Sequence, residues 1–206
     1  MLEAAGYRVE IPPRVLCCGR PLYDYGMLDL AKKVLRQSMD ALRPWVEQGV
    51  PIVGLEPSCV AVFRDELKNL FPGENVPMVL LSEFLSKNNC KLPALKRRAI
   101  VQAHCHQKSV LGMADEQAVM SRLGLDYRVL DSGCCGMAGA FGFEHYDVSM
   151  KCAERVLLPE VREAPQDSLI VANGFSCREQ IVQGTGRRAL HLAEAIRMGL
   201  RGSSIG

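Results

Sequence analysis

Asp-Ser-Gly-Cys-Cys-Gly-Met-Ala-Gly, which occupies residues 131–139, contains a Cys-Cys-Gly motif that occurs a second time at residues 17–19. Each copy is followed by one more cysteine in a Ser-Cys pair, and the spacing from Cys18 to Cys59 is nearly the same as that from Cys135 to Cys177. Self-similarity at a fixed spacing indicates a duplicated structural unit. The sequence therefore predicts two related halves, each with its own group of cysteines.

Short runs of β-branched residues alternate along the chain with longer helical patterns, which is typical of βαβ units and a parallel sheet. Strands are expected at residues 15–16, 51–55, 99–103, 127–130 and 169–172. Helices are expected within 28–45 and 148–157, and after the two late cysteines at 60–70 and 178–182. The sequence therefore predicts an α/β fold of two related (duplicated) half-domains, with small parallel sheets and with cysteines at the strand ends.

Residues 87–93 form the best candidate linker, so the half-domains are expected to cover residues 1–88 and 94–206. The second half has a further cysteine, Cys105, well before its Cys-Cys-Gly motif. The stretch from Cys105 to Cys134 is longer than the whole stretch that precedes Cys17, so a matching cysteine of the first half would fall upstream of the start. We expect the first half-domain to be incomplete at its start and this sequence to be the C-terminal piece of a longer chain.

Composition and charge exclude several classes of protein. The 25 Lys and Arg residues nearly balance the 23 Asp and Glu residues and are spread along the chain, so the sequence shows no footprint for nucleic acid or anionic lipid. No apolar run approaches the roughly 18 residues that a membrane span needs, and the first residues lack the pattern of a signal peptide. An odd count of nine cysteines without an export signal argues against a disulfide framework. We expect a cytoplasmic protein that could lie against the inner face of the membrane.

The cysteines of the repeat are candidate metal ligands. In the second half they are Cys105, Cys134, Cys135 and Cys177. In the first half they are Cys17, Cys18 and Cys59. The second-half set follows predicted strands, and in an open α/β sheet such positions converge on a crevice at the carboxyl ends of the strands. Because soft thiolates select iron–sulfur clusters, zinc or Cu(I), this convergence of cysteines predicts a metal site. No side chain is predicted to be catalytic.

Two alternatives to an iron–sulfur site stay open. Four thiolates also suit a structural zinc ion, and a Cys-Cys pair can act as a thiol–disulfide redox centre without metal. His104 and His106 could also ligate a metal, but on an extended backbone both would point away from Cys105, which favours hydrogen bonds to a sulfur or a loop carbonyl. Cys90 and Cys152 lie outside the repeat and are expected to be buried as small apolar side chains.

Several segments together resemble those of a known family. They are residues 19–26 (Gly-Arg-Pro-Leu-Tyr-Asp-Tyr-Gly), 56–59 (Glu-Pro-Ser-Cys), 104–106 (His-Cys-His), 131–139 and 174–180 (Gly-Phe-Ser-Cys-Arg-Glu-Gln). With these motifs the chain resembles the cysteine-rich (CCG) domain family. That family includes a heterodisulfide reductase subunit, the glycolate oxidase iron–sulfur subunit, an anaerobic glycerol-3-phosphate dehydrogenase subunit and the C-terminal parts of FAD-linked D-lactate-type dehydrogenases.

The resemblance implies an iron–sulfur electron-transfer module of a flavin-linked oxidoreductase that acts on a 2-hydroxy acid of the D-lactate or glycolate type. Electrons would pass from FAD, held on a separate domain or partner, to a quinone, cytochrome or ferredoxin. A ferredoxin-like 4Fe–4S segment is a further implied partner, so the chain is not expected to turn over alone. In the heterodisulfide reductase branch the last cysteine belongs to a Cys-X-X-Cys pair, whereas Val62 and Gln180 stand here. Four ligands then remain in the complete half, which favours a simple 4Fe–4S cluster over a noncubane one.

Overall fold

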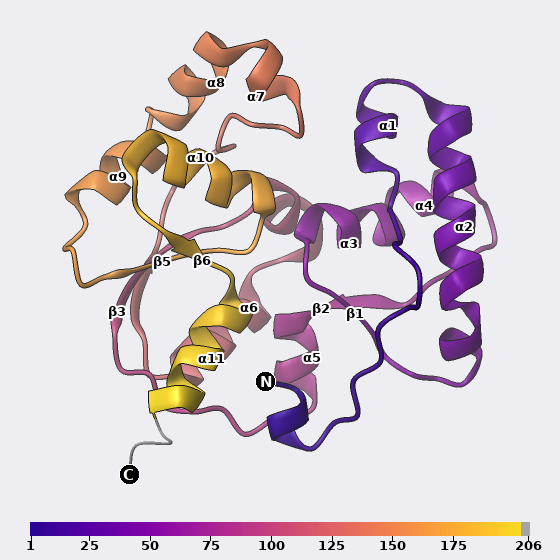
Figure 1. The fold of residues 1–206 in the computed structure, drawn as a ribbon, viewed down its shortest axis with the longest axis horizontal. Helices are drawn as coiled ribbons and strands as arrows, with labels where there is room; N and C mark the ends of the chain where they lie inside the picture. The colour runs from indigo at the N-terminus through magenta and orange to yellow at the C-terminus, as the bar shows by residue number, and fades with distance from the viewer. Residues whose placement is uncertain (203–206) are drawn as a thin grey trace.

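The computed structural model describes residues 1–202 and contains two parallel β-sheets. The smaller sheet pairs β1 (Ile52–Gly54) with β2 (Met78–Leu80). The larger sheet has the order β4-β3-β5-β6, formed by β3 (Arg98–Gln102), β4 (Asp126–Val129), β5 (Leu169–Ala172) and β6 (Ala189–Leu190). Helices surround both sheets (Figure 1). The prediction of an α/β fold with small parallel sheets is confirmed.

The helices connect these strands and cover their faces. In the first half they are η1 (Glu3–Ala5, a 3-10 turn), α1 (Arg20–Asp24), α2 (Leu28–Glu47), α3 (Pro57–Arg64), α4 (Glu66–Leu70) and α5 (Leu81–Lys87). In the second half they are η2 (Gln107–Leu111, a π-helical turn), α6 (Ala114–Arg122), α7 (Phe141–Glu144), α8 (Tyr146–Ala153), α9 (Leu157–Glu163), α10 (Phe175–Thr185) and α11 (Leu192–Gly202).

The two halves share part of one topology, formed by the last two strands of each half and the helices that follow them. β1 leads into α3 and β5 leads into α10, and Cys59 and Cys177 are each the third residue of that helix. The next strands, β2 and β6, lead directly into α5 and α11. At the starts of these two helices Glu83 and Glu194 accept a backbone N–H three residues before them, at 2.7 and 2.9 Å. The predicted duplication is therefore confirmed at the level of strand, helix and helix cap, and the exact boundary between the halves stays a prediction.

Several expected elements differ in the structure. The strand expected at residues 15–16 is wrong: Val15 is 99% exposed and the segment pairs with no strand among the described residues. α2 extends to Glu47 and so continues through Pro44, although a proline inside a helix removes one backbone hydrogen bond. The helix expected within 148–157 is two helices, α8 and α9, and its residue Val148 is exposed. Strands β2 and β6 were not predicted from the sequence, because two or three residues are too few to show the alternation of apolar and polar side chains that marks a strand.

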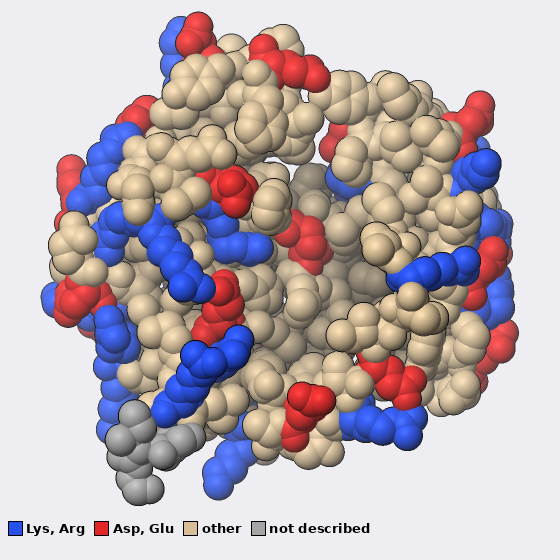
Figure 2. Space-filling model, viewed as in Figure 1, with Lys and Arg blue, Asp and Glu red and all other residues tan. Residues whose placement is uncertain are grey.

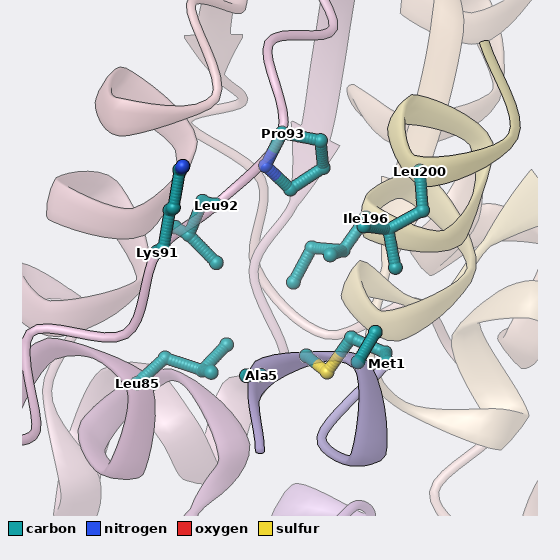
Figure 3. A pocket seen from close by; sticks show the side chains of 9 residues that line it. Met1, Ala5, Leu85, Lys91, Leu92, Pro93, Ile196 and Leu200 are labelled. Carbon is teal, nitrogen blue, oxygen red and sulfur yellow. The ribbon is translucent and has the colours of Figure 1, made fainter. Parts of the chain in front are cut away.

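The apolar core extends across both halves. α5 belongs to the first half by sequence, yet its Phe84 and Leu85 are buried in one cluster with Val101 of β3 and Val171 of β5. A small apolar cavity of about 20 Å³ lies where η1 meets α5 and α11, between Met1, Leu85 and Ile196 (Figure 3). It has room for about one water molecule. The contacts made by α5 therefore join the two halves.

None of the helices within residues 1–202 is both long and apolar enough to cross a membrane.

Candidate metal centre

The larger sheet brings the four candidate cysteines of the second half together. Cys105 follows β3, Cys134 and Cys135 follow β4, and Cys177 starts α10 after β5. Because these three strands are parallel neighbours, their carboxyl ends lie at one edge of the sheet. The thiols lie close enough to affect one another's pKa, Cys105 with Cys134, Cys134 with Cys135, and Cys135 with Cys177. The structure therefore assembles the predicted set at one place.

The close approach of these thiols divides Cys105, Cys134 and Cys135 by protonation. The pKa of Cys134 is lowered to about 2, chiefly by hydrogen bonds from the thiols of Cys105 and Cys135 and also by backbone N–H groups, among them that of Gly136 at 3.3 Å. The pKa values of Cys105 and Cys135 are raised by the same contacts and by burial. One thiolate is thus stabilised by neighbours that stay protonated. All four thiols can ionise together only if a cation balances their charge.

The first half assembles a group of three cysteines. The thiol sulfur atoms of Cys18 and Cys59 are 3.0 Å apart, and Cys17, which is exposed, lies at the same turn. The hydrogen bond from Cys59, helped by the backbone N–H and the guanidinium of Arg20, lowers the pKa of Cys18 to about 7. The same pairing raises the pKa of Cys59. This group also contains one thiol that ionises readily beside one that does not.

The two Cys-Cys-Gly turns have the same local geometry. Gly19 and Gly136 both adopt left-handed backbone angles, with φ of 80° and 95°. Each donates its N–H to the sulfur of the first cysteine of its pair, at 3.4 and 3.3 Å. Each also packs against the backbone of the helix behind it, at Ala31 and Ser149. The repeated motif therefore encodes a repeated turn that directs a backbone N–H at the sulfur of the first cysteine of each pair.

His104 and His106 lie beside Cys105, and their ring nitrogens and its sulfur are all within 4.8 Å of one another. The backbone here is not extended as expected, because Cys105 and His106 begin a helical turn. The imidazole rings still stack on the same side, with centroids 5.4 Å apart. His106 Nδ1 is 3.9 Å from the sulfur of Cys105, and His104 Nδ1 accepts the backbone N–H of His106. His106 is thus the histidine placed to interact with a sulfur.

Two charged residues near the cysteines were not predicted from the sequence as functional. Arg20 is buried, ion-paired with Glu66 and with Asp24 at 3.5 Å, and its charge stabilises the thiolate of Cys18. Glu56 is the N-cap of α3 and lies between the halves. Arg20 directly follows a Cys-Cys-Gly motif and Glu56 precedes a Pro-Ser-Cys segment, so position in the motif was the available signal.

A third carboxyl group, Glu116 of α6, lies behind the second-half cysteines. It is buried and accepts hydrogen bonds from the side-chain amides of Gln107, in the turn after Cys105, and Asn173, just before α10, the latter at 2.8 Å. Burial raises its pKa to about 7. Glu116 therefore ties together two of the segments that carry cysteines.

The two cysteines outside the repeat lie elsewhere. Cys90 is buried, as expected, in the core that joins the halves, 3.5 Å from the hydroxyl of Tyr7. Cys152, in α8, is half-buried rather than buried. All nine cysteines are in the described part of the chain and none forms a disulfide there.

The surface is hollowed between the helices that follow the two Cys-Cys-Gly turns, with α1 on one side and α7 and α8 on the other (Figures 1 and 2). Tyr25, just after α1, donates a hydrogen bond to Glu144 of α7 at 2.5 Å, so the two sides touch across this hollow. Several large apolar side chains of these helices are exposed, among them Phe143 and Tyr146. The cysteine-bearing turns thus lie next to an open face of the molecule.

Comparison with known proteins finds a family model and several relatives that match most of the chain. The family model described as "Cysteine-rich domain" (CCG) matches residues 1–64 and 112–181. The chain is 30% identical over 197 residues to D-2-hydroxyglutarate dehydrogenase of Pseudomonas putida, a match that covers 93% of this chain and 19% of that protein. It is 27% identical to an anaerobic glycerol-3-phosphate dehydrogenase subunit of Escherichia coli, covering 95% and 53%, and 26% identical to lactate utilization protein A 2 of Bacillus cereus, covering 97% and 89%. The chain thus spans a fifth to a half of the first two relatives.

Proposed function

Since the chain belongs to the cysteine-rich domain family, we propose that it is an iron–sulfur electron-transfer module. The observation that carries the proposal is the convergence of Cys105, Cys134, Cys135 and Cys177 at the carboxyl ends of three neighbouring parallel strands, where their thiols affect one another's pKa. Those thiols can all ionise only beside a cation, and thiolate sulfur is the ligand that iron–sulfur clusters require. The donor set therefore fits a cluster with four cysteine ligands, of the 4Fe–4S type.

What such a cluster supplies is one-electron transfer, and the protein around it sets the potential. The backbone N–H groups of Gly19 and Gly136 donate to sulfur, and the guanidinium of Arg20 places positive charge near Cys18. Such donors and charges stabilise the reduced, more negative form. Met137 and Ile181 pack with Cys135 and Cys177 in one buried cluster, which keeps water from that side of the site.

The names of the relatives support a role beside a dehydrogenase. One is a D-2-hydroxyglutarate dehydrogenase and another a lactate utilization protein, and both names point to 2-hydroxy acids. We infer that this chain serves as the iron–sulfur part of an FAD-linked oxidoreductase for a 2-hydroxy acid of the D-lactate or glycolate type. Its partners would be the FAD-binding domain or subunit and a ferredoxin-like 4Fe–4S segment, with a quinone, cytochrome or ferredoxin as acceptor.

The first half would hold a second, less complete site. Its ligands would be Cys17, Cys18 and Cys59, with the fourth position filled by water, a histidine or a further cysteine. An open position and the exposure of Cys17 make such a site more easily lost. We expect the first-half site to lose iron before the second-half site when both are exposed to air.

Single Cys→Ser variants test the ligand set in the full chain after anaerobic reconstitution with iron and sulfide. Substitution of Cys105, Cys134, Cys135 or Cys177 is expected to abolish the second-half site. Cys90→Ser and Cys152→Ser are the matched controls, because neither residue belongs to the repeated motifs. Iron and acid-labile sulfide content, with the visible absorption that dithionite bleaches, give the result. Equal metal content in all six variants would contradict the assignment.

The same preparations separate the rival functions. A structural zinc protein would be colourless and would carry zinc after reconstitution. A thiol–disulfide redox protein would keep its dithiol activity after chelation, because the reaction needs only the cysteines. The crowded thiols are compatible with both, so the metal content and the reversible bleaching decide among the three functions.

A further inference from the structure

Glu56 is hydrogen-bonded to the starts of two helices that belong to different halves. Its carboxylate accepts the backbone N–H of Ser58 in α3 at 3.4 Å and that of Phe175, the first residue of α10, at 2.8 Å. α3 carries Cys59 and α10 carries Cys177. One carboxylate therefore connects the two helices that bring the late cysteine to each group.

Two histidines of the second half hold the same segment. His191 Nε2 is 2.9 Å from the carbonyl oxygen of Leu55, and His104 Nε2 is 3.9 Å from the Glu56 carboxylate. In both rings Nδ1 accepts a backbone N–H from two residues further on, so Nε2 carries the hydrogen. That of His191 donates to the carbonyl oxygen of Leu55, and that of His104 faces the Glu56 carboxylate. The donors to Glu56 itself, the backbone N–H groups of Ser58 and Phe175 and the hydroxyl of Ser58, are all uncharged.

The space around this junction is closely filled. A Cβ at Gly174, the N-cap of α10, would lie 2.2 Å from the His104 ring, so the ring packs directly on the start of the helix. Glu56 lies three residues before Cys59, and on its other side its carboxylate faces the ring of His104, which directly precedes Cys105. The carboxylate therefore lies between the two cysteine groups.

We propose that Glu56 is a positioning residue that fixes the two cysteine groups relative to each other and lowers the reduction potential of the second-half site. This inference rests on the proposed iron–sulfur function. A fixed negative charge disfavours the more negative, reduced form of a cluster, so its removal raises the potential. Because Glu56 belongs to the first half by sequence, an effect on the second-half site would be specific to the junction.

The test uses the full chain carrying Cys18→Ser, so that only the second-half site remains, and measures its midpoint potential by redox titration. Glu56→Gln keeps a side-chain acceptor and removes the charge, and we expect unchanged iron content with a shift to more positive potential. Glu56→Asp keeps the charge and is expected to restore a potential near that of the parent. Glu83→Gln is the matched control, because the Glu83 carboxylate also accepts a backbone N–H at a helix start, that of Leu80 at 2.7 Å, and it should leave the potential unchanged.

A second variant covers the case in which Glu56→Gln does not fold. Phe175→Pro removes only the donor on α10, because proline is well tolerated at the first position of a helix and Pro57 occupies that position in α3. Phe175 is 60% exposed, so its side chain contributes little packing. We expect this variant to keep its iron and to shift the potential. Full iron content with the parent potential in either folded variant would overturn the inference. A parent protein without iron–sulfur absorption would instead overturn the proposed function, and the inference with it.

Discussion

The residue after each cysteine pair shows why the motif needs glycine. At Gly136 φ is +95° and a Cβ would lie 2.2 Å from the carbonyl oxygen of Ser149. Backbone angles of this kind are costly for other residues, and no side chain has space there. The turn that aims the N–H of Gly136 at the sulfur of Cys134 therefore depends on the missing side chain.

Gly136→Ala is expected to destabilise the protein by about 2–5 kcal/mol, the sum of the left-handed strain and the overpacking. It should also reduce metal content, because the turn carries two ligands. Gly133→Ala is the control: a Cβ at Gly133 meets nothing within 4 Å and its φ is not in the left-handed region. Urea unfolding and iron analysis of the two variants give the comparison. Equal effects of the two substitutions would refute the role of the turn.

The buried carboxyl group of Glu116 predicts a dependence of stability on pH. Its pKa rises from an ordinary 4.5 to about 7 on folding, so the folded state binds the proton more tightly. The stabilisation is complete below pH 4.5 and is lost as the pH rises through about 7. The shift corresponds to about 3 kcal/mol.

Metal-free Glu116→Gln protein should therefore show a flatter decline of the unfolding free energy between pH 5 and 7 than the parent. Glu163→Gln, at an exposed glutamate, serves as the control. Urea unfolding at a series of pH values makes the measurement, and parallel pH profiles for the parent and Glu116→Gln would show that Glu116 does not cause the dependence.

The sequence predicted the cysteines and could not predict their partners. The seven cysteines repeat at a spacing that is visible without any structure. The hydrogen bond between Glu56 and Phe175 joins residues 119 positions apart, and the contact of Glu116 with Asn173 joins residues 57 apart. These contacts arise from the packing of segments that are far apart in the chain, so no local sequence pattern indicates them.

Helices and strands could be predicted from the sequence where their pattern of apolar residues was long. The 20-residue helix α2 and the fully buried strand β5 appeared in the sequence at nearly their final positions. Residues 15–16 have side chains that favour a strand, but they pair with no strand within residues 1–202, and strand propensity alone does not form a strand without a hydrogen-bonded neighbour. The two short strands β2 and β6 are held by parallel pairing with β1 and β5, which only the assembled sheet provides.

The helix α5 is the element on which the union of the halves depends most. Leu85 is 1% exposed and packs in the cluster that contains residues of β3 and β5. Leu85→Ala is expected to cost about 2–5 kcal/mol, because it leaves a cavity in this shared core. Amide hydrogen exchange should then accelerate in both β1 and β5, since both halves depend on the cluster.

Leu30→Ala, at an exposed leucine of α2, is the control and should change the unfolding free energy by less than about 0.5 kcal/mol. Faster exchange confined to the first half in Leu85→Ala would mean that the halves are independently stable, contrary to the shared core.

At the scale of the whole molecule, duplication explains the arrangement of the site. Each half has a parallel strand that leads into a helix with a cysteine near its start. The helices that follow the two Cys-Cys-Gly turns lie on opposite sides of the surface hollow. The junction at Glu56 joins the helix starts of the two halves. The result is two cysteine groups on one framework, as the proposed electron-transfer module requires.

The identity of the bound metal tests the central claim most directly. The full chain, reconstituted anaerobically with iron-57 and sulfide in the presence of competing zinc, can be studied by Mössbauer spectroscopy with parallel metal analysis. We predict iron in tetrahedral sulfur coordination, with acid-labile sulfide, and loss of the second-half component in Cys134→Ser. A colourless protein with stoichiometric zinc and no sulfur-ligated iron would contradict the account.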